Sequence, residues 1–330
     1  MVRTPTVEDV AQRAGVSRQT VSNVLNTPAI VKATTRERVQ QAIAELGYRR
    51  HAAARQLRTR RSSTIGIHLS PYLGGVSGVV LDRFVHALTE RASERGMRML
   101  VYAARSAADE IDRLSELWEG SEIDAAVITE TFHGDPRTRW LREAQLPFVA
   151  FGRPWGEDDL AAPEHLWVDV DGAAGTRAAT EHALGFGPRV AFLGWPTGSG
   201  TGDDRERGWR EAMAAAGVSG PRWAAEDDVT AARAAAGAVA SVDAVVCASD
   251  SLAIGALLAQ ASGPRRVPVI GFDNTPTAEA LGFSSVEQRP EDVAGATLEL
   301  LMGPTGEAVT PRDVQAGTAH ILIEPHLVVR

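Results

Sequence analysis

Four side chains able to form hydrogen bonds lie at helical spacing near the start of the chain. Arg18, Gln19, Ser22 and Asn23 carry donors and acceptors that suit nucleic-acid base edges or phosphates. The apolar positions 21, 24 and 25 form a separate helix face that must pack on neighbours. Ser17 is a good helix N-cap, which places Arg18 and Gln19 in the first turn. The stretch predicts a short helix whose polar first turn meets a partner.

A second short helix is predicted directly before this one, over residues 6–14. Thr6 and Asp9 have the spacing of a capping box, although Glu or Gln is the usual partner. Gly15 can adopt the positive φ that ends a helix. Two short helices joined by a Gly-containing turn, the second beginning with Arg and Gln, predict a helix-turn-helix. The geometry alone leaves open an ordinary helical hairpin with a solvated polar tip.

The complete string of this segment closely resembles the opening of the lactose-repressor (LacI/GalR) family of bacterial transcription regulators. The shared positions are Thr6-x-x-Asp9-Val10-Ala11-x-x-Ala14-Gly15-Val16-Ser17-x-x-Thr20-Val21-Ser22-x-Val24-Leu25-Asn26. In an operator complex, we expect Arg18 to read guanine and Gln19 to read adenine. Asn23 replaces the Arg of many family members, so a different operator base is expected there. Phosphate contacts are expected from Ser17, Thr20, Asn26, Thr34 and Arg36, and Thr6 and Ser22 complete the predicted DNA-binding set.

A third helix and a basic linker follow. The helix is predicted over residues 35–46, with Thr34 and Glu37 as a capping box. Residues 51–61 are alanine-rich and basic, and alone they form only a marginal helix. The resemblance implies that this segment is a hinge helix, in which Leu57 wedges into the DNA minor groove and Arg55 contacts the duplex. A flexible basic linker is the alternative.

The charge is divided unevenly along the chain. Residues 1–61 carry 12 Arg and Lys against 4 Asp and Glu, a balance of +8, whereas the remainder carries a balance of −16. Only the basic head is therefore expected to meet a polyanion. The single cysteine, Cys247, excludes an intrachain disulfide and is expected to be buried. We find no signal peptide and no bilayer-spanning apolar run, so a cytoplasmic protein without a membrane partner is expected.

From residue 63 onward, apolar strands alternate with amphipathic helices, which predicts parallel sheets covered by helices. The expected strands are residues 65–69, 98–102, 124–128, 148–151, 189–194, 243–248 and 267–272. The expected helices are residues 80–95, 109–119, 173–184, 204–216, 231–240, 251–260 and 290–301. Seven strands before a β-rich tail favour two lobes, and the resemblance implies Rossmann-like, periplasmic-binding-protein-like lobes joined by three crossovers.

The predicted fold is therefore α/β, with a three-helix head and a two-lobed effector core. The predicted domains are 1–50 for the helix-turn-helix, 51–61 for the hinge and 62–330 for the effector-binding and dimerisation core. Within the core, the first lobe is expected at about 62–160 plus 289–318, and the second at 161–288 plus 319–330.

Polar and aromatic residues follow several predicted strands, where ligands bind in open α/β sheets. Arg205 and Asp273 match family positions that reach the effector, and both suit sugar hydroxyls. The remaining candidates are Trp155, Trp195, Trp209, Ser249 and Asp250. Each Trp is at least as well explained by core packing, and Arg205 by a surface salt bridge with Asp203 or Asp204. Ser249 replaces the usual Asn, which weakens that assignment.

Other site chemistries lack the residues they require. The glycine-rich stretch 198–202 fits neither phosphate-loop spacing, so a flexible loop is expected. The eight His are scattered, so no metal is expected, and no cofactor is implied. No nucleophile–base pair supports an enzyme.

We therefore predict a homodimeric, sugar-responsive regulator, most simply a repressor that a mono- or oligosaccharide releases from operator DNA. A corepressor-type regulator with a purine-like effector and a stand-alone small-molecule-binding protein are the alternatives.

Overall fold

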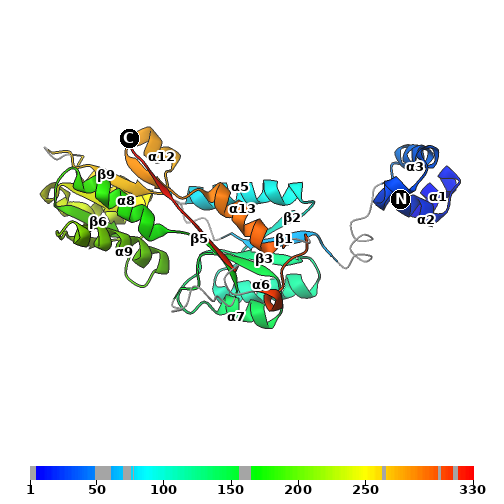
Figure 1. Ribbon diagram of the computed structural model, residues 1–330, viewed down its shortest axis with the longest axis horizontal. Helices are drawn as coiled ribbons and strands as arrows, with labels where there is room; N and C mark the ends of the chain where they lie inside the picture. Colours follow the sequence, from blue (N-terminus) through cyan, green and yellow to red (C-terminus); the bar gives the residue numbers. More distant parts are fainter. Residues whose placement is uncertain are drawn as a thin grey trace. The chain divides into compact units, whose positions relative to one another are not determined.

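The computed structural model describes residues 5–48, 61–69, 76, 78–155, 165–261, 265–303, 306–314 and 319–330 (Figure 1). The chain divides into two compact units, residues 1–61 and 62–330. Of the predicted hinge, only Arg61 is described, and Arg55 and Leu57 lie outside the described residues.

The first unit is a helical head built as the sequence predicts. Its elements are α1 (Val7–Ala14), α2 (Arg18–Asn26), the 3-10 turn η1 (Pro28–Ile30) and α3 (Ala33–Leu46). Thr6 and Asp9 form the reciprocal capping box of α1, and Gly15 ends that helix with φ of +65°. Ser17 caps α2 by accepting from the amide of Thr20. Small and β-branched side chains from all three α-helices fill the core: Val10, Ala11, Ala14, Val21, Val24, Val39 and Ala42.

The start of α3 differs from the prediction. The helix begins at Ala33 after Lys32, and no side chain caps it. The amides of Thr35 and Arg36 both bond the Lys32 carbonyl, so the first turn forms one to two residues earlier than expected. The predicted capping box of Thr34 with Glu37 is therefore wrong, because Thr34 lies inside the first turn.

The second unit contains two six-stranded sheets. The first has the order β11-β5-β4-β3-β1-β2, and the second β12-β10-β9-β8-β6-β7. Strand pairing is parallel throughout except between β10 and β12. The first sheet contains β1 (Thr64–His68), β2 (Arg98–Tyr102), β3 (Ala125–Ile128), β4 (Phe148–Phe151), β5 (Leu166–Val170) and β11 (His320–Ile323). The second contains β6 (Val190–Gly194), β7 (Arg222–Ala224), β8 (Ala244–Cys247), β9 (Val269–Phe272), β10 (Ser284–Glu287) and β12 (His326–Val328).

Helices cover both sheets. In the first lobe, α5 and α13 lie on one face of the sheet and α6 and α7 on the other (Figure 1), each pair over its own apolar cluster. These helices are α5 (Gly78–Glu94), α6 (Ala107–Glu119), α7 (Pro136–Glu143) and α13 (Pro290–Leu301), with η3 (Pro311–Asp313) following. The second lobe has α8 (Gly172–Leu184), α9 (Gly200–Ala215), α10 (Val229–Ala235), η2 (Ala236–Ser241), α11 (Asp250–Ala259) and α12 (Pro276–Leu281). Cys247 is buried, as predicted. No described helix is both long and apolar enough to cross a membrane.

The lobe boundaries differ from the prediction. Because β5 pairs with β4, the first lobe extends to residue 170 rather than 160, and because β11 pairs with β5, it also takes in 320–323. The chain crosses between the lobes after β5, between β10 and α13, and between β11 and β12, which gives the three expected crossovers. The first lobe is therefore 62–170 with 290–323, and the second is 171–289 with 324–330.

The glycine-rich stretch is not the expected flexible loop. Residues 200–202 form the first turn of α9, capped by the Ser199 hydroxyl, which accepts from the Gly202 amide. A Cβ added at Gly200 would lie 2.2 Å from the indole of Trp155, and one at Gly202 would lie 2.9 Å from Trp195. These glycines are needed because two indoles pack against this turn.

Candidate DNA interface and effector cavity

The first turn of α2 carries the predicted base-reading side chains. Arg18 and Gln19 are both exposed, and Gln19 Nε2 donates to Asn23 Oδ1 at 2.9 Å. Arg18 Nη1 lies 2.9 Å from Glu8 Oε1, an ion pair that sequence inspection missed because Glu8 lies on the other helix. Ser22 is half-buried. This face therefore presents the hydrogen-bonded side-chain amides of Gln19 and Asn23. It also presents the Arg18 guanidinium, which must separate from Glu8 before it can contact a base.

The predicted phosphate-binding residues, together with Thr6 of the wider DNA-binding set, fall into two groups. The hydroxyls of Thr6 and Ser17 are engaged in helix caps, the latter also with the Thr20 hydroxyl at 2.9 Å. Thr34 is exposed, and Arg36 Nη1 donates to the Pro28 carbonyl at 3.4 Å. Only the backbone of Asn26 is described.

A cavity of about 190 Å³ lies between the two lobes. Of the predicted effector contacts, Trp155 and Arg205 line it. The first lobe also contributes Val80, Leu81, Thr129, Glu130, Thr131, Phe151, Gly152, Asp169 and Val170, and the second lobe and crossovers contribute Gly172, Thr201, Asp204 and Gln288.

Arg205 is buried in the cleft rather than exposed. Its guanidinium donates through Nη1 to the Ala248 carbonyl, lies 3.7 Å from Asp273 Oδ1, and stacks 3.8 Å from the Phe272 ring centroid. Burial raises the pKa of Asp273 well above its usual range, while the Arg205 charge opposes that shift. The surface salt bridge considered for Arg205 is therefore wrong, because the side chain points into the protein.

Arg153 connects the two walls of the cleft. Its Nε donates to Asp169 Oδ2 at 2.6 Å, its Nη2 to the Val170 carbonyl at 2.9 Å, and its Nη1 to Asp204 Oδ1 at 3.4 Å. Its guanidinium also lies 4.9 Å from the Trp155 ring centroid. Arg153 follows the predicted strand 148–151 but was not among the predicted effector residues, and Asp169 was missed because β5 was not predicted.

The other predicted effector residues do not line the cavity. Trp209 stacks on Phe192 in the apolar core of the second lobe, with ring centroids 5.6 Å apart. Ser249 caps α11 and donates to Asp227. Asp250 accepts from the amide and hydroxyl of Thr275 and from the Ser285 hydroxyl. These three residues stabilise local structure. Trp195 packs against Arg205, with its ring centroid 5.2 Å from the Arg205 guanidinium carbon.

Several buried polar atoms around the cavity have no hydrogen-bond partner among the described residues. They are Thr129 Oγ1, Trp155 Nε1 and Arg205 Nε. Buried polar groups normally find partners, and a ligand with many hydroxyls would supply them. The flat indole of Trp155 beside these atoms suits the apolar face of a sugar ring.

A helix-turn-helix head with a two-lobed core around a polar cavity defines a ligand-controlled DNA-binding protein. Residues 6–51 match the family described as bacterial regulatory proteins, lacI family, and residues 181–330 match the periplasmic binding protein-like domain. The HTH-type transcriptional regulator CelR of Thermobifida fusca is 34% identical over 354 residues, which cover 99% of this chain and 98% of that protein. The chain belongs to the lacI family of bacterial transcription regulators.

Solved structures agree with this assignment. A complex of the transcriptional regulator CelR with cellobiose has a TM-score of 0.69 and 30% identity, covering 99% of both chains. The lac repressor dimer bound to operator and the anti-inducer ONPF has a TM-score of 0.82 over 99% of this chain and 98% of that chain, and at 23% identity it supports the fold. The predicted fold, family and regulatory class are thus confirmed, and the family is one of regulators rather than enzymes.

Proposed function

We propose that this regulator is a repressor and that a mono- or oligosaccharide bound in the inter-lobe cavity lowers its affinity for operator DNA. The observation that carries the proposal is the buried Arg205–Asp273 pair beside a cavity whose wall includes Trp155. The cellobiose bound to CelR supports a sugar effector.

In this proposal, each part of the cavity meets a different part of the sugar. Arg205 Nε and Thr129 Oγ1 bond ring hydroxyls, which satisfies atoms that have no partner among the described residues. Trp155 stacks on the apolar ring face. Gln288, held by Asp273 at 2.6 Å, presents an amide to a further hydroxyl. The contacts come from both lobes, so the sugar favours one arrangement of them.

The head binds DNA through α2 in the major groove. Arg18 reads guanine and Gln19 reads adenine, each worth about 1–3 kcal/mol of discrimination, with Asn23 adding a further contact. Two heads of a homodimer meet the two halves of a near-palindromic operator. Ser17, Thr20, Asn26, Thr34 and Arg36 position the head on phosphates, while Thr6 and Ser22 support the same face. Residues 51–61, with Arg55 and Leu57, bind the minor groove between the half-sites.

The test is a pair of reciprocal titrations of the full chain. Calorimetry with a panel of mono- and disaccharides that includes glucose and cellobiose is carried out with and without operator duplex, and operator affinity is measured with and without each sugar. Linkage requires sugar and operator to weaken each other by the same factor. Arg205→Gln should abolish the sugar response. Arg177→Gln, which removes a half-exposed ion pair with Glu211 in the same lobe, should preserve it. Failure of every mono- and disaccharide to bind, or tighter operator binding with ligand, would overturn the proposal.

A further inference from the structure

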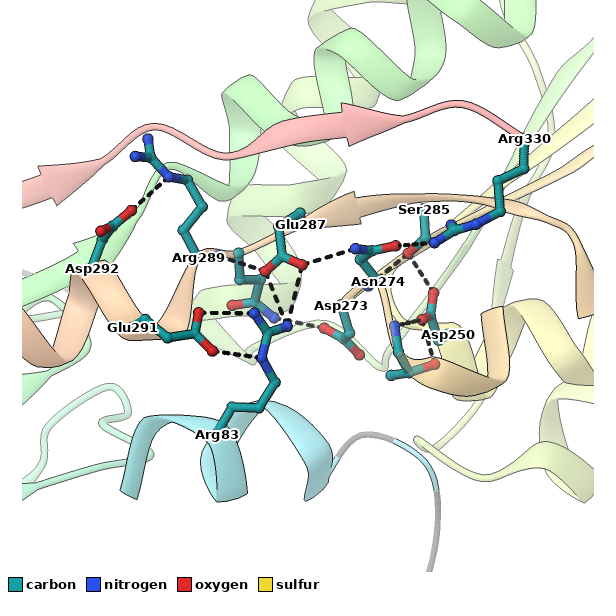
Figure 2. Close-up of polar contacts among 12 residues, drawn as sticks. Arg83, Asp250, Asp273, Asn274, Ser285, Glu287, Arg289, Glu291, Asp292 and Arg330 are labelled. Atoms are coloured by element: carbon teal, nitrogen blue, oxygen red, sulfur yellow. Dashed lines mark hydrogen bonds and ion pairs between the residues drawn. The ribbon is translucent and has the colours of Figure 1, made fainter. Parts of the chain in front are cut away.

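A three-residue ionic cluster of Arg83, Glu287 and Glu291 joins the two lobes (Figure 2). Arg83 of α5 grips Glu291 of α13 with two bonds of 2.8 Å, through Nε and Nη2. Its Nη1 also lies 3.2 Å from both carboxylate oxygens of Glu287, the last residue of β10. Arg83 and Glu291 belong to the first lobe, whereas Glu287 belongs to the second. Within this cluster, the Arg83–Glu287 contact is therefore the one that spans the lobes.

The second lobe fixes Glu287 in place. Its Oε2 accepts from Asn274 Nδ2 at 2.8 Å, and Asn274 Oδ1 in turn accepts from Arg330 Nη2 at 2.7 Å. The backbone amide of Asn274 donates to Ser285 Oγ at 2.9 Å. The Glu287 side chain is only 10% exposed. A carboxylate held this firmly provides a fixed charge for Arg83 to meet.

The backbone around this cluster is strained. Asp273, Asn274 and Arg289 have φ values of 120°, 48° and 58°, which L-residues rarely adopt. Such conformations persist only where surrounding contacts hold them, and they are concentrated at ligand clamps and switches. Asp273 and Asn274 lie at the end of β9, and Arg289 lies at the crossover from β10 to α13, one of the three connections between the lobes.

The same two loops also reach the cavity. Gln288 follows Glu287 in the chain, lines the cavity and donates to Asp273 Oδ1. Asp273 precedes Asn274 and lies beside Arg205. The residues that hold the ionic cluster are thus chain neighbours of Gln288, which lines the cavity, and of Asp273, which contacts both Gln288 and Arg205 behind the wall. The cluster and the cavity wall are therefore placed by the same backbone.

We propose that the Arg83–Glu287 contact is an inter-lobe lock that stabilises the sugar-binding arrangement of the lobes at the expense of the operator-binding one. This inference rests on the proposed function above. The lobe arrangement described here has both cavity walls in contact, because Arg153 reaches Asp204 across them. Weakening the lock would shift the population of lobes away from this arrangement.

The experiment measures the cellobiose dissociation constant without DNA and the operator dissociation constant without sugar, on the same full-chain variants. In a two-arrangement equilibrium, the ratio of these constants varies inversely with the population ratio of the sugar-binding to the operator-binding arrangement. The ratio of the two dissociation constants therefore changes when the lock is weakened, whichever arrangement is the more populated in the wild type. Arg83→Gln and Glu287→Gln should each raise it about fivefold, at the lower end of typical allosteric couplings. Gln at position 287 removes the charge and keeps one acceptor oxygen for either Asn274 Nδ2 or the Arg289 backbone amide, both of which donate to Glu287.

Glu291→Gln is the matched control. It removes the shorter of the two Arg83 ion pairs, whose two residues both belong to the first lobe. Because this pair does not join the lobes, the ratio should stay at the wild-type value. The double variant Arg83→Gln/Glu287→Gln should change the ratio no more than either single one, because one contact is lost in all three. Equal shifts for Glu287→Gln and Glu291→Gln, no shift for either, or a fall in the ratio for Glu287→Gln would overturn the lock while leaving the sugar effector intact. If another mono- or disaccharide binds in place of cellobiose, the same ratio is measured with that sugar. Absence of binding by every sugar tested would overturn the proposed function and this inference with it.

Discussion

Arg153 of the first lobe lies 3.4 Å from Asp204 of the second, beside the cavity. Both side chains are less than a tenth exposed. The Asp204 carboxylate also accepts from the Ala173 amide at 3.1 Å at the start of α8, so it anchors three segments at once. The contact joins opposite walls of the cleft and fixes the arrangement in which Arg205, Trp155 and Gln288 face one space.

Removing Arg153 should therefore harm both stability and sugar binding. Arg153→Met leaves Asp169 buried without its partner, which should lower the free energy of unfolding by about 3–5 kcal/mol. Arg207→Gln provides the control, because Arg207 pairs with the same Asp204 from a half-exposed position. That change should cost about 1 kcal/mol or less. Urea denaturation measures the free energy of unfolding of both variants, and equal losses of stability would contradict the structural role assigned to Arg153.

Gln19 and Arg36 should affect DNA binding in different ways. Gln19→Ala should relax preference at particular operator positions by about 1–3 kcal/mol, because an amide that reads a base edge is lost. Arg36→Ala should weaken binding to all sequences alike and reduce the salt dependence. Competition assays on a panel of singly substituted operators distinguish the two outcomes. A uniform loss for Gln19→Ala would remove that residue from base reading.

Gly208 allows α9 to pack closely on α8. A Cβ at this position would lie 2.1 Å from the Ala173 carbonyl oxygen, which is backbone and has little freedom to move. Gly208→Ala should therefore destabilise the chain by about 1–3 kcal/mol or more. Gly237→Ala, where no atom lies within 4 Å of an added Cβ, should cost nothing or stabilise slightly. Thermal unfolding of the two variants gives the comparison, and similar melting temperatures would contradict it.

His165 should make stability fall in mild acid. It is buried on Phe148, and burial lowers its pKa from 6.5 to about 4. The folded protein therefore resists protonation of His165, whereas the unfolded chain accepts a proton below pH 6.5. The contribution is constant above pH 6.5 and declines as the pH falls toward 4, by about 3 kcal/mol in total. Unfolding titrations of wild type and His165→Leu across this range should diverge progressively, and parallel pH profiles would refute the assignment.

The head could be predicted almost completely from the sequence, because its signals are local. The Thr6–Asp9 box, Gly15 and the Ser17 cap each act within a few residues, and all three form as expected. The predicted Thr34 cap was wrong because α3 begins after Lys32 with backbone hydrogen bonds and without a side-chain cap.

The cavity was less predictable because its walls come together across long chain separations. Asp169 lies in β5, which was not among the predicted strands, and the role of Arg153 becomes clear only when Asp169 and Asp204 lie beside it. Conversely, Trp209 and Ser249 follow the expected ligand-site pattern but are used for core packing and capping. A position at the end of a strand therefore identifies candidate ligand-binding residues, and tertiary packing determines which of them line the cavity.

The most direct measurement is the anisotropy of a labelled operator duplex titrated with the purified protein, with and without saturating cellobiose, against a random duplex of equal length. We predict tight binding to the operator alone, weak and salt-sensitive binding to the random duplex, and a large loss of operator affinity on adding sugar that Arg205→Gln prevents. Equal binding to both duplexes, unchanged by sugar, would contradict the central claim that the cavity controls the head.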